Sequence, residues 1–594
     1  MTATTPENGL RARIRRVARG AVGFAIVLGL SGLTYAPSAV AADGDTTPAS
    51  VSLHVTAGVR GVVSAGGPAT ASVTVQNDGD AALSAGRVDV EIDRTPIADR
   101  AALSDWLTDE KVADDDDFRP LAGEDTAAVD AKSEGLASVS IPQEALADLA
   151  PGVYRLRAAL TGATTGTGAD AVSQKASTTT VLVIAADQRP QVTVLVPITA
   201  TPAGRALLTR DELIELTAPD GDLTAQLEGV SGTSAVLAVD PSIPAAIRAL
   251  GTSAPVQVSD WLIRLENLPN ERFALQFGDA DPTTQAQAGL PALLQPTTLA
   301  PFLLPADFQP QPGASGTPTA TPDPTPTTGP QLPDDQTLTE IDGAVSGILW
   351  PRGGVTTDDL ARFAEYVDRT VTTILPSTSL ADLPSGHATV DGHDVLVTDA
   401  AASEAFSQAA AEPDAAARGR SLAAANAALF FTGQQAAGTP LLVGLDRDDN
   451  RTADALREAI VAADTPGVGL TSLRSAPATN ATLSDDAADA RGASLQLLLA
   501  EEGELAAFST ILDDPQVLLS PERIRIMRTI GAGSSDKRFD ADVTAHRKAT
   551  RTTLSAVDIP QSSTIQLLTA NADLPFGVRN DLPWPVNIRL TVRP

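Results

Sequence analysis

The chain has 594 residues, a formal net charge of −32 and no cysteine. The missing cysteine excludes disulfides, thiolate metal sites and a cysteine nucleophile. The negative charge argues against nucleic acid as a partner, because binding to phosphates needs a basic surface, and favours a role in solubility instead. A chain of this length exceeds a single hydrophobic core and indicates about three domains.

Residues 1–42 have the pattern of a secretory signal peptide. Five arginines at positions 11–19 precede an apolar run at 21–33, and small residues follow at 39–42. That apolar run is shorter than the roughly 20 residues that a membrane-spanning helix needs. We therefore predict an exported protein that loses this segment; the alternative is an uncleaved membrane anchor.

Residues 43–187 alternate apolar and polar side chains with the period of β-strands. Turn signals such as Asn77-Asp78-Gly79 separate the alternating segments, which are 51–56, 71–76, 87–92, 137–141, 153–160 and 178–184. This pattern predicts an immunoglobulin-like β-sandwich. An acidic run at 113–117 interrupts it, which we interpret as a solvated loop, with a calcium site as the alternative.

Residues 188–475 alternate short apolar strands with helical patterns. The expected strands are 192–197, 235–239, 273–277, 347–350, 372–375, 395–398 and 441–445, and Thr209 with Glu212 forms a capping box for the first helix. Seven such units predict a seven-stranded parallel (β/α) barrel, closed or nearly closed. A Pro/Thr-rich insertion at 309–335 is expected to be a disordered surface loop between the third and fourth strands.

The remaining residues predict two further parts. Residues 476–560 are mostly helical and are expected to form a layer on the flank of the barrel. At 561–594 the two-residue period returns, in 565–569, 576–578 and 586–592, which indicates the start of a C-terminal β-sandwich domain. Three strands do not cover a sheet face, so we expect this domain to continue beyond residue 594.

Four sequence blocks carry a resemblance to a known family: Val194-Leu195-Val196-Pro197-Ile198, Leu237-Ala238-Val239-Asp240-Pro241, residues 273–281 and Asn580-Asp581-Leu582-Pro583. They resemble a family of uncharacterised exported actinobacterial envelope proteins that are commonly encoded beside the lipid II flippase. The resemblance implies a cell-envelope location, a membrane anchor in the missing C-terminus, and a cell-wall glycan or an envelope membrane protein as partner, but no reaction. At the level of fold, the barrel resembles glycoside hydrolase family 57 and the polysaccharide deacetylases.

Aspartates follow several of the expected barrel strands, where the loops of such a barrel converge. Asp240, Asp279 and Asp281 are candidate catalytic carboxylates, since glycoside hydrolysis uses a pair of them. Asp240 and Asp281 each precede a proline and are equally explained as helix caps. Asp279 lacks such a local explanation and is the strongest single candidate.

Three further residues at strand ends are candidates for ligand binding. Trp350 offers a stacking face for a sugar and Arg352 a hydrogen-bond donor, while Asp399 is either a ligand contact or a helix cap. Asp446 opens an acidic run that is interpreted as a solvated turn, with a calcium loop as the alternative.

Metal and cofactor chemistry find no support in the sequence. The chain has four histidines and lacks the His-x-x-x-His spacing of a zinc hydrolase, and no Gly-x-Ser-x-Gly elbow is present. We therefore expect no metal site and no cofactor, and we expect His387 and His393 to be exposed loop residues.

Three functions are compatible with these observations. The preferred hypothesis is a non-catalytic binding or scaffolding protein of the cell envelope, linked to cell-wall precursor export or glycan recognition. The second is a glycan-active hydrolase that uses the strand-end carboxylates, and the third is a structural spacer.

Overall fold

The computed structural model describes residues 51–589, except for 109–116, 167, 186–189, 205, 310–329, 368–369, 382–385, 436–437, 448–450, 485–488 and 561–576. The predicted signal peptide, the acidic run at 113–116 and most of the Pro/Thr-rich insertion lie outside these residues. Within the described residues, no helix combines the length and apolar character needed to cross a membrane.

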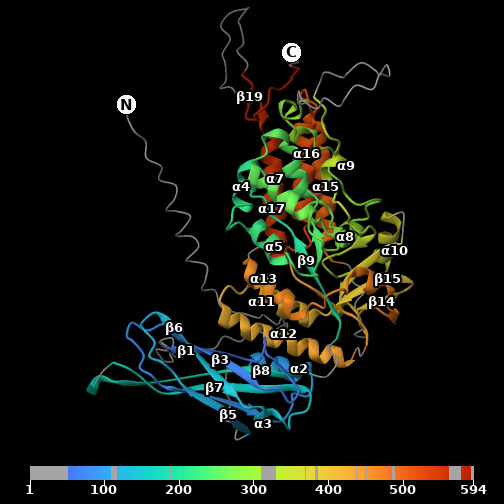
Figure 1. Cartoon of the computed structure of the whole chain (residues 1–594). Coiled ribbons are helices and arrows are strands. Elements are labelled where there is room, and N and C mark those ends of the chain that lie inside the picture. The colour runs from blue at the N-terminus through green and yellow to red at the C-terminus, as the bar shows by residue number, and fades with distance from the viewer. Residues whose placement is uncertain are drawn as a thin grey trace, which may run out of the picture. The chain divides into compact units, whose positions relative to one another are not determined.

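The first described part is a two-sheet β-sandwich (Figure 1). One sheet has the order β1 (Val51–Ala57), β3 (Ala69–Asn77), β6 (Ser133–Ile141), and the other has the order β2 (Val62–Ser64), β8 (Val172–Ala185), β7 (Gly152–Thr165), β4 (Arg87–Asp93), β5 (Phe118–Asp125). Buried residues alternate along β1 and β3, and the side chains of both sheets form one core. The predicted alternation is thus a sandwich with a shared core, and the outer face of β8 is also buried, where Val181 and Val183 pack with Ala423 and Ala427.

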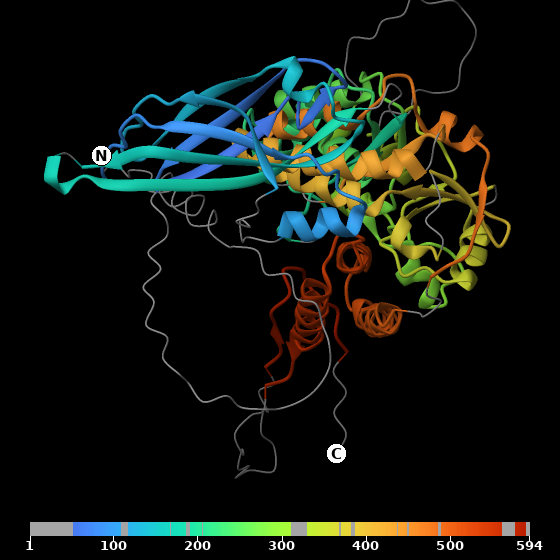
Figure 2. The same ribbon diagram turned by 90° about the horizontal axis from the view of Figure 1, so that it is seen from below.

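A tyrosine at the start of β7 strengthens the likeness to immunoglobulin folds. The Tyr154 hydroxyl donates a hydrogen bond of 2.8 Å to the carbonyl of Ala150, four residues upstream. This is the arrangement of a tyrosine corner. The long hairpin of β7 and β8 is visible in Figure 2 as the extended teal pair of strands.

The second part is a parallel barrel of seven strands. In spatial order these are β11 (Arg272–Ala274), β10 (Val236–Val239), β9 (Val192–Ile198), β16 (Leu441–Gly444), β15 (His393–Thr398), β13 (Thr372–Pro376) and β12 (Ile348–Leu349). Consecutive strands are therefore neighbours around the barrel, as the strand–helix pattern predicted. At the open seam the Val345 amide donates a hydrogen bond to the carbonyl of Arg272, so the barrel is nearly closed.

The interior of the barrel is filled with side chains. Leu195, Val236, Phe273, Ile374 and Leu396, each from a different strand, belong to a single buried cluster. Neighbouring residues on the same strands, such as Val194 and Leu237, belong instead to the core beneath the helices. Both faces of the strands are thus buried, which explains their uninterrupted apolar runs.

Helices cover the outside of the barrel, and the first begins at the predicted capping box: Thr209 accepts from the Glu212 amide, and Glu212 bonds back to Thr209. The helices are α4 (Arg210–Leu216), α5 (Asp222–Val230), α6 (Ser242–Ala249), α7 (Val256–Glu266), α8 (Pro282–Gln287), α9 (Asp335–Thr339), α10 (Thr357–Tyr366), α11 (Ala400–Ala411), α12 (Ala415–Gln435), α13 (Ala453–Ala463) and α14 (Leu470–Ser475).

An added hairpin corrects the expectation that His387 is an exposed loop residue. His387 begins β14 (His387–Val390), which pairs antiparallel with β15 and parallel with β17 (Thr479–Ala481). The turn between β14 and β15 has left-handed Asp391 and Gly392, a hairpin signal that the sequence carries. His387 is 6% exposed because its ring lies between the Ala476 carbonyl and Asp394.

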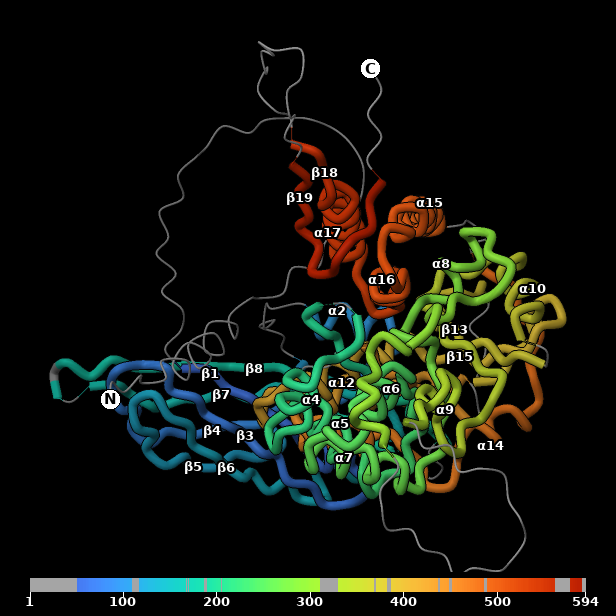
Figure 3. The backbone as a smooth tube through the Cα atoms, turned by 90° about the horizontal axis from the view of Figure 1, so that it is seen from above, coloured from blue at the N-terminus to red at the C-terminus, as the bar shows by residue number. Residues whose placement is uncertain are grey.

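The C-terminal part is a layer of three helices, α15 (Arg491–Ser509), α16 (Gln516–Thr529) and α17 (Asp536–Leu554), seen in red and orange in Figure 3. After it, β18 (Val557–Asp558) pairs with β19 (Arg579–Asn580). The expected strand at 586–592 is absent from its described residues 586–589, because Trp584 and Val586 pack on the apolar end of this layer instead.

Candidate functional site

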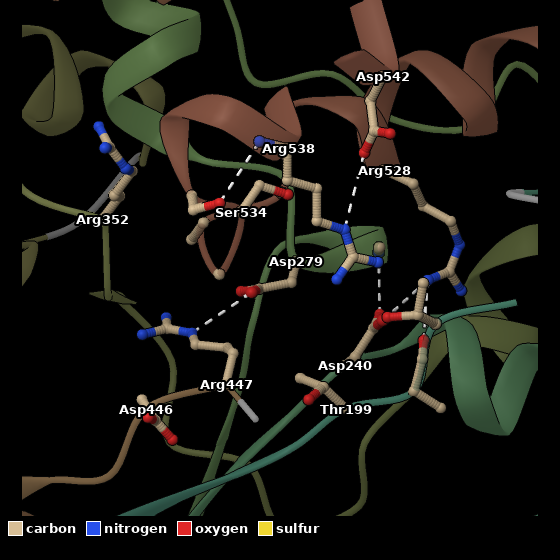
Figure 4. Close-up of a pocket in the computed structure, with 17 residues that line it drawn as sticks. Thr199, Asp240, Asp279, Arg352, Asp446, Arg447, Arg528, Ser534, Arg538 and Asp542 are labelled. Atoms are coloured by element: carbon tan, nitrogen blue, oxygen red, sulfur yellow. Dashed lines mark hydrogen bonds and ion pairs between the residues drawn. The ribbon is translucent and has the colours of Figure 1, made fainter. Parts of the chain in front are cut away.

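A cavity of about 530 Å³ lies at the carboxyl ends of the barrel strands (Figure 4). Its walls come from the loops after β9, β10, β11, β12 and β16, together with the α16–α17 connection and the first turns of α17. Eight of the 17 residues that line the cavity are charged, four arginines and four aspartates: Arg352, Arg447, Arg528, Arg538, Asp240, Asp279, Asp446 and Asp542.

The helical layer joins the barrel by backbone bonds at this cavity. The Asp281 amide donates to the Ile530 carbonyl, and the Ala532 amide donates to the Asp279 carbonyl, both at 2.9 Å. Ala280 and Gly531 form an isolated antiparallel bridge between these bonds. The segment after β11 and the α16–α17 loop are therefore held in one geometry.

Asp279 faces the cavity from a turn with unusual backbone geometry. Gly278 and Asp279 have φ values of +68° and +53°, both in the left-handed region. The Gly278 amide donates 2.9 Å to Asp240 Oδ1, which holds this turn in place. A left-handed aspartate beside a cavity is the kind of local strain that concentrates at functional sites.

The charge state of Asp279 is set by its surroundings. Its side chain is 13% exposed, and Arg447 Nε lies 3.3 Å from its Oδ2. Burial raises the pKa of Asp279 to about 6, and the negative charges of Asp240 and Asp281 add to this effect, whereas Arg447 opposes it. Asp279 therefore changes charge near pH 6.

Asp240 lines the same cavity, but its oxygens are already engaged. Oδ1 accepts from the amides of Ser242 and Gly278, both at 2.9 Å, and Oδ2 accepts from the Ser242 hydroxyl at 2.7 Å. Arg528 Nη1 lies 3.9 Å from Oδ2, and Asp240 is 1% exposed. Asp240 is thus bound into the structure of the loop.

Asp281 is a helix cap and does not line the cavity. Its carboxylate accepts from the amides of Thr283 and Thr284 at the start of α8 and from the Thr284 hydroxyl. It also accepts from the Arg352 amide at 3.0 Å. The capping interpretation of the Asp-Pro pair accounts for these contacts.

Trp350 lies beneath the cavity. Its ring belongs to the cluster inside the barrel, and the Arg447 guanidinium lies 4.0 Å above the ring centroid. Arg447 also donates to the Trp350 carbonyl at 2.9 Å. The expected stacking face for a sugar is therefore covered by an arginine, which itself lines the cavity.

The other two predicted ligand residues lie in different places. Arg352 lines the cavity, and its guanidinium bonds to Asp489 and Asp536, linking the end of β12 to the helical layer. Asp399 caps α11 by accepting from the Ala402 amide, and it bonds to Arg100 of α2 (Arg100–Thr108) and to Thr432. Asp399 does not line the cavity.

Sequence reasoning missed four of the charged residues of the cavity. Arg447 directly follows Asp446 at the end of a predicted strand, so the strand-end rule was sufficient to find it. Arg528, Arg538 and Asp542 come from the helical layer, more than 240 positions after Asp279. Their one local signal is the small-residue turn at 531–535 ahead of α17.

The described residues contain no group of three or more histidine, cysteine or acidic side chains that is placed to hold a metal ion. Three members of the acidic run after Asp446, residues 448–450, lie outside these residues. Asp446 itself is 60% exposed and pairs with Arg451.

Similar solved structures match only parts of the chain. The CARDB domain of the PF1109 protein from Pyrococcus furiosus is 14% identical, with 23% of this chain and 86% of that chain covered and a TM-score of 0.14. Spo0M from Bacillus subtilis is 7% identical (23% and 50% covered, TM-score 0.15), and a β-glucosidase from Listeria innocua is 14% identical (23% and 16% covered, TM-score 0.13). At these TM-scores the likenesses carry no argument about function.

No curated protein matches the chain. A family model does match, over residues 13–594. The chain therefore belongs to a family of unknown function, DUF6049.

Proposed function

We propose that this protein is exported and binds a segment of cell-wall glycan in the cavity at the mouth of its barrel, without cleaving it. The observation that carries this proposal is the convergence of four arginines and four aspartates on one cavity. The export-type pattern of residues 1–42 supports an envelope location.

The balance of charges in the cavity favours a neutral, hydroxyl-rich ligand. With equal numbers of arginines and aspartates, an ion of either sign gains little from the overall field of the cavity. A hydroxyl group both donates and accepts hydrogen bonds, so it uses arginine donors and carboxylate acceptors together. Saccharides present such groups densely.

Binding without turnover fits the state of the candidate carboxylates. Glycoside hydrolysis uses two carboxyl groups that reach the scissile bond from opposite sides. Asp281 caps α8 and does not line the cavity, and both Asp240 oxygens accept hydrogen bonds from neighbouring groups. Neither of the two carboxylates that the sequence suggested as catalytic partners of Asp279 is therefore available for that role.

One observation favours a hydrolase as the second candidate. Asp279 has a pKa of about 6, which suits a general acid, and Asp542 is another carboxylate on the wall of the same cavity. The two candidates differ in one measurable result, because a hydrolase releases new reducing ends and a binding protein does not.

Calorimetric titration with a soluble tetrasaccharide of β-1,4-linked N-acetylhexosamine tests the proposal. We expect the wild-type chain to bind it with a dissociation constant in the micromolar to millimolar range, roughly −4 to −8 kcal/mol. Arg447→Ala removes a cavity donor and should weaken binding by about tenfold or more. Arg264→Ala is the matched control, because Arg264 lies half-exposed on α7 and does not line the cavity.

The same samples separate the alternatives. Reducing ends that accumulate with the wild-type chain and not with Asp279→Asn would establish the hydrolase. A wild-type chain that binds neither the tetrasaccharide nor isolated cell-wall glycan would overturn the proposal and favour a structural spacer.

A further inference from the structure

Two charged residues on one helix line the outer part of the cavity. Arg538 and Asp542 lie one turn apart near the start of α17, and both reach toward the loops that carry Asp240 and Asp279 (Figure 4). Arg538 Nε lies 3.8 Å from Asp542 Oδ2, with the two side chains 57% and 12% exposed. This is a long and partly solvated ion pair.

The order of these charges does not favour the helix. Arg538 is the third residue of α17, after the cap Ser535, where an acidic side chain interacts better with the helix dipole and completes a capping box. An i,i+4 pair is also more stabilising when the acidic residue comes first. Helix stability therefore does not account for an arginine at 538 followed by an aspartate at 542.

The other arginines of the cavity are held by shorter bonds. Arg528 donates to two carbonyls and to Ser242 at 2.8–3.0 Å, and Arg352 bonds to two aspartates at 2.5 and 2.8 Å. Arg447 is fixed between the Trp350 ring and Asp279. Arg538 combines the greatest exposure of the four with a long ion pair, so a ligand can engage it at low cost.

We propose that Arg538 and Asp542 are specificity-determining residues of the cavity, and that they exchange their mutual ion pair for hydrogen bonds to two neighbouring hydroxyl groups of one sugar unit. This inference rests on the proposed saccharide-binding function. Asp542 accepts from the hydroxyl groups, and the planar Arg538 guanidinium donates to their oxygens.

Exchanging Arg538 and Asp542 along the helix distinguishes a role in ligand recognition from a structural role. In the double variant Arg538→Asp with Asp542→Arg, the charge of the cavity is unchanged and the order of charges now suits the helix dipole. We expect the melting temperature to stay equal or rise, while affinity for the N-acetylhexosamine tetrasaccharide falls by about tenfold or more. A pair that merely stabilises α17 or balances charge would keep wild-type affinity in this variant.

Single variants complete the test. Arg538→Ala should weaken binding by a similar factor. Arg538→Lys should keep only part of the wild-type affinity, because lysine keeps the charge but lacks the planar guanidinium group. Lys537→Ala is the matched control, since it removes a cation from the same turn of α17 at an exposed position outside the cavity. All four variants are compared with the wild type by calorimetric titration and by melting temperature.

The outcomes separate this inference from the proposed function. If the wild type binds, Arg447→Ala weakens binding, and both the charge-swapped variant and Arg538→Ala bind as the wild type does, the cavity binds the saccharide but this inference is wrong. If the wild type itself does not bind, both are overturned. Lower affinity in the charge-swapped variant with an unchanged or higher melting temperature supports the inference.

Discussion

Replacing Asp279 by asparagine should stabilise the protein in a pH-dependent way. The folded protein raises the pKa of Asp279 from 3.8 to about 6, chiefly by burial. At about 1.4 kcal/mol for each pH unit, this corresponds to about 3 kcal/mol by which ionised Asp279 destabilises the fold. Asparagine has nearly the same shape and carries no charge, so it removes most of that cost.

The sign and the pH window follow from proton binding. Between pH 4 and 6 the folded chain holds a proton on Asp279 that the unfolded chain has lost, so stability falls as pH rises through this range. The stabilising contribution is complete below about pH 4 and is lost as pH passes about 6. The variant lacks this dependence of stability on pH. Its free energy of unfolding should exceed that of the wild type by about 0 at pH 4 and by about 1–3 kcal/mol at pH 8. The lower end of this range allows for the weaker contact of asparagine with Arg447.

Scanning calorimetry of both proteins between pH 4 and 8 measures this difference. Asp446→Asn is the control, because it makes the same replacement at a side chain of the same cavity that is 60% exposed. An Asp279→Asn variant that is less stable than the wild type at pH 8, or that differs from it equally at every pH, would refute the reasoning.

Three further predictions concern other parts of the chain. Gly278→Ala should cost about 1–2 kcal/mol of stability, because φ is +68° and the new Cβ would lie 2.9 Å from Arg528 Cγ; an unchanged melting temperature would contradict this. His387→Ala should cost about 2–3 kcal/mol, because it leaves the Asp394 carboxylate without its 2.8 Å partner, and urea unfolding of the two proteins gives the difference. N-terminal sequencing of the exported protein should start after residue 41 or 42, and a chain that still begins at Met1 would disprove signal-peptide removal.

The barrel could be predicted because its strands are buried on both faces. Each of the seven expected strands has a counterpart in the structure, and uninterrupted runs such as Val192–Ile198 are fully buried. Between them, side-chain caps such as Thr209 mark helix starts. Over this region the capping residues and apolar runs favour the same helices and strands that tertiary packing stabilises, and for this reason the sequence predicts them.

Elements without such a signal were missed. β5 contains Pro120 and pairs with β4 through a register shift at Val90 and Glu91, so its alternation is broken. β14 has four residues, too few to show a two-residue period. The Asp391-Gly392 pair beside it is nevertheless a sequence signal for a hairpin turn. Short or irregular strands depend on their partners more than on their own sequence.

Strand-end aspartates mix two roles that the sequence alone does not separate. Asp281 and Asp399 accept hydrogen bonds from the first amides of the helices that follow them. Asp279 lies in a left-handed turn, and its side chain enters the cavity. Asp240 combines both roles, because it lines the cavity and accepts a hydrogen bond from the Ser242 amide at the start of α6.

The cavity itself is built by two parts of the chain that are distant in sequence. Backbone bonds from Asp281 to Ile530 and from Ala532 to Asp279 fix the α16–α17 loop against the barrel, and this places Arg528 and Arg538 over the strand ends. A fragment that ends with the barrel would therefore keep the buried carboxylates and lose the helical wall that supplies half of the arginines. The carboxyl groups of Asp240 and Asp279 would then lose the positive charge of Arg528 on that side, because this arginine interacts with both. The helical layer is thus part of the site, and binding assays on this protein need a chain that extends through α17.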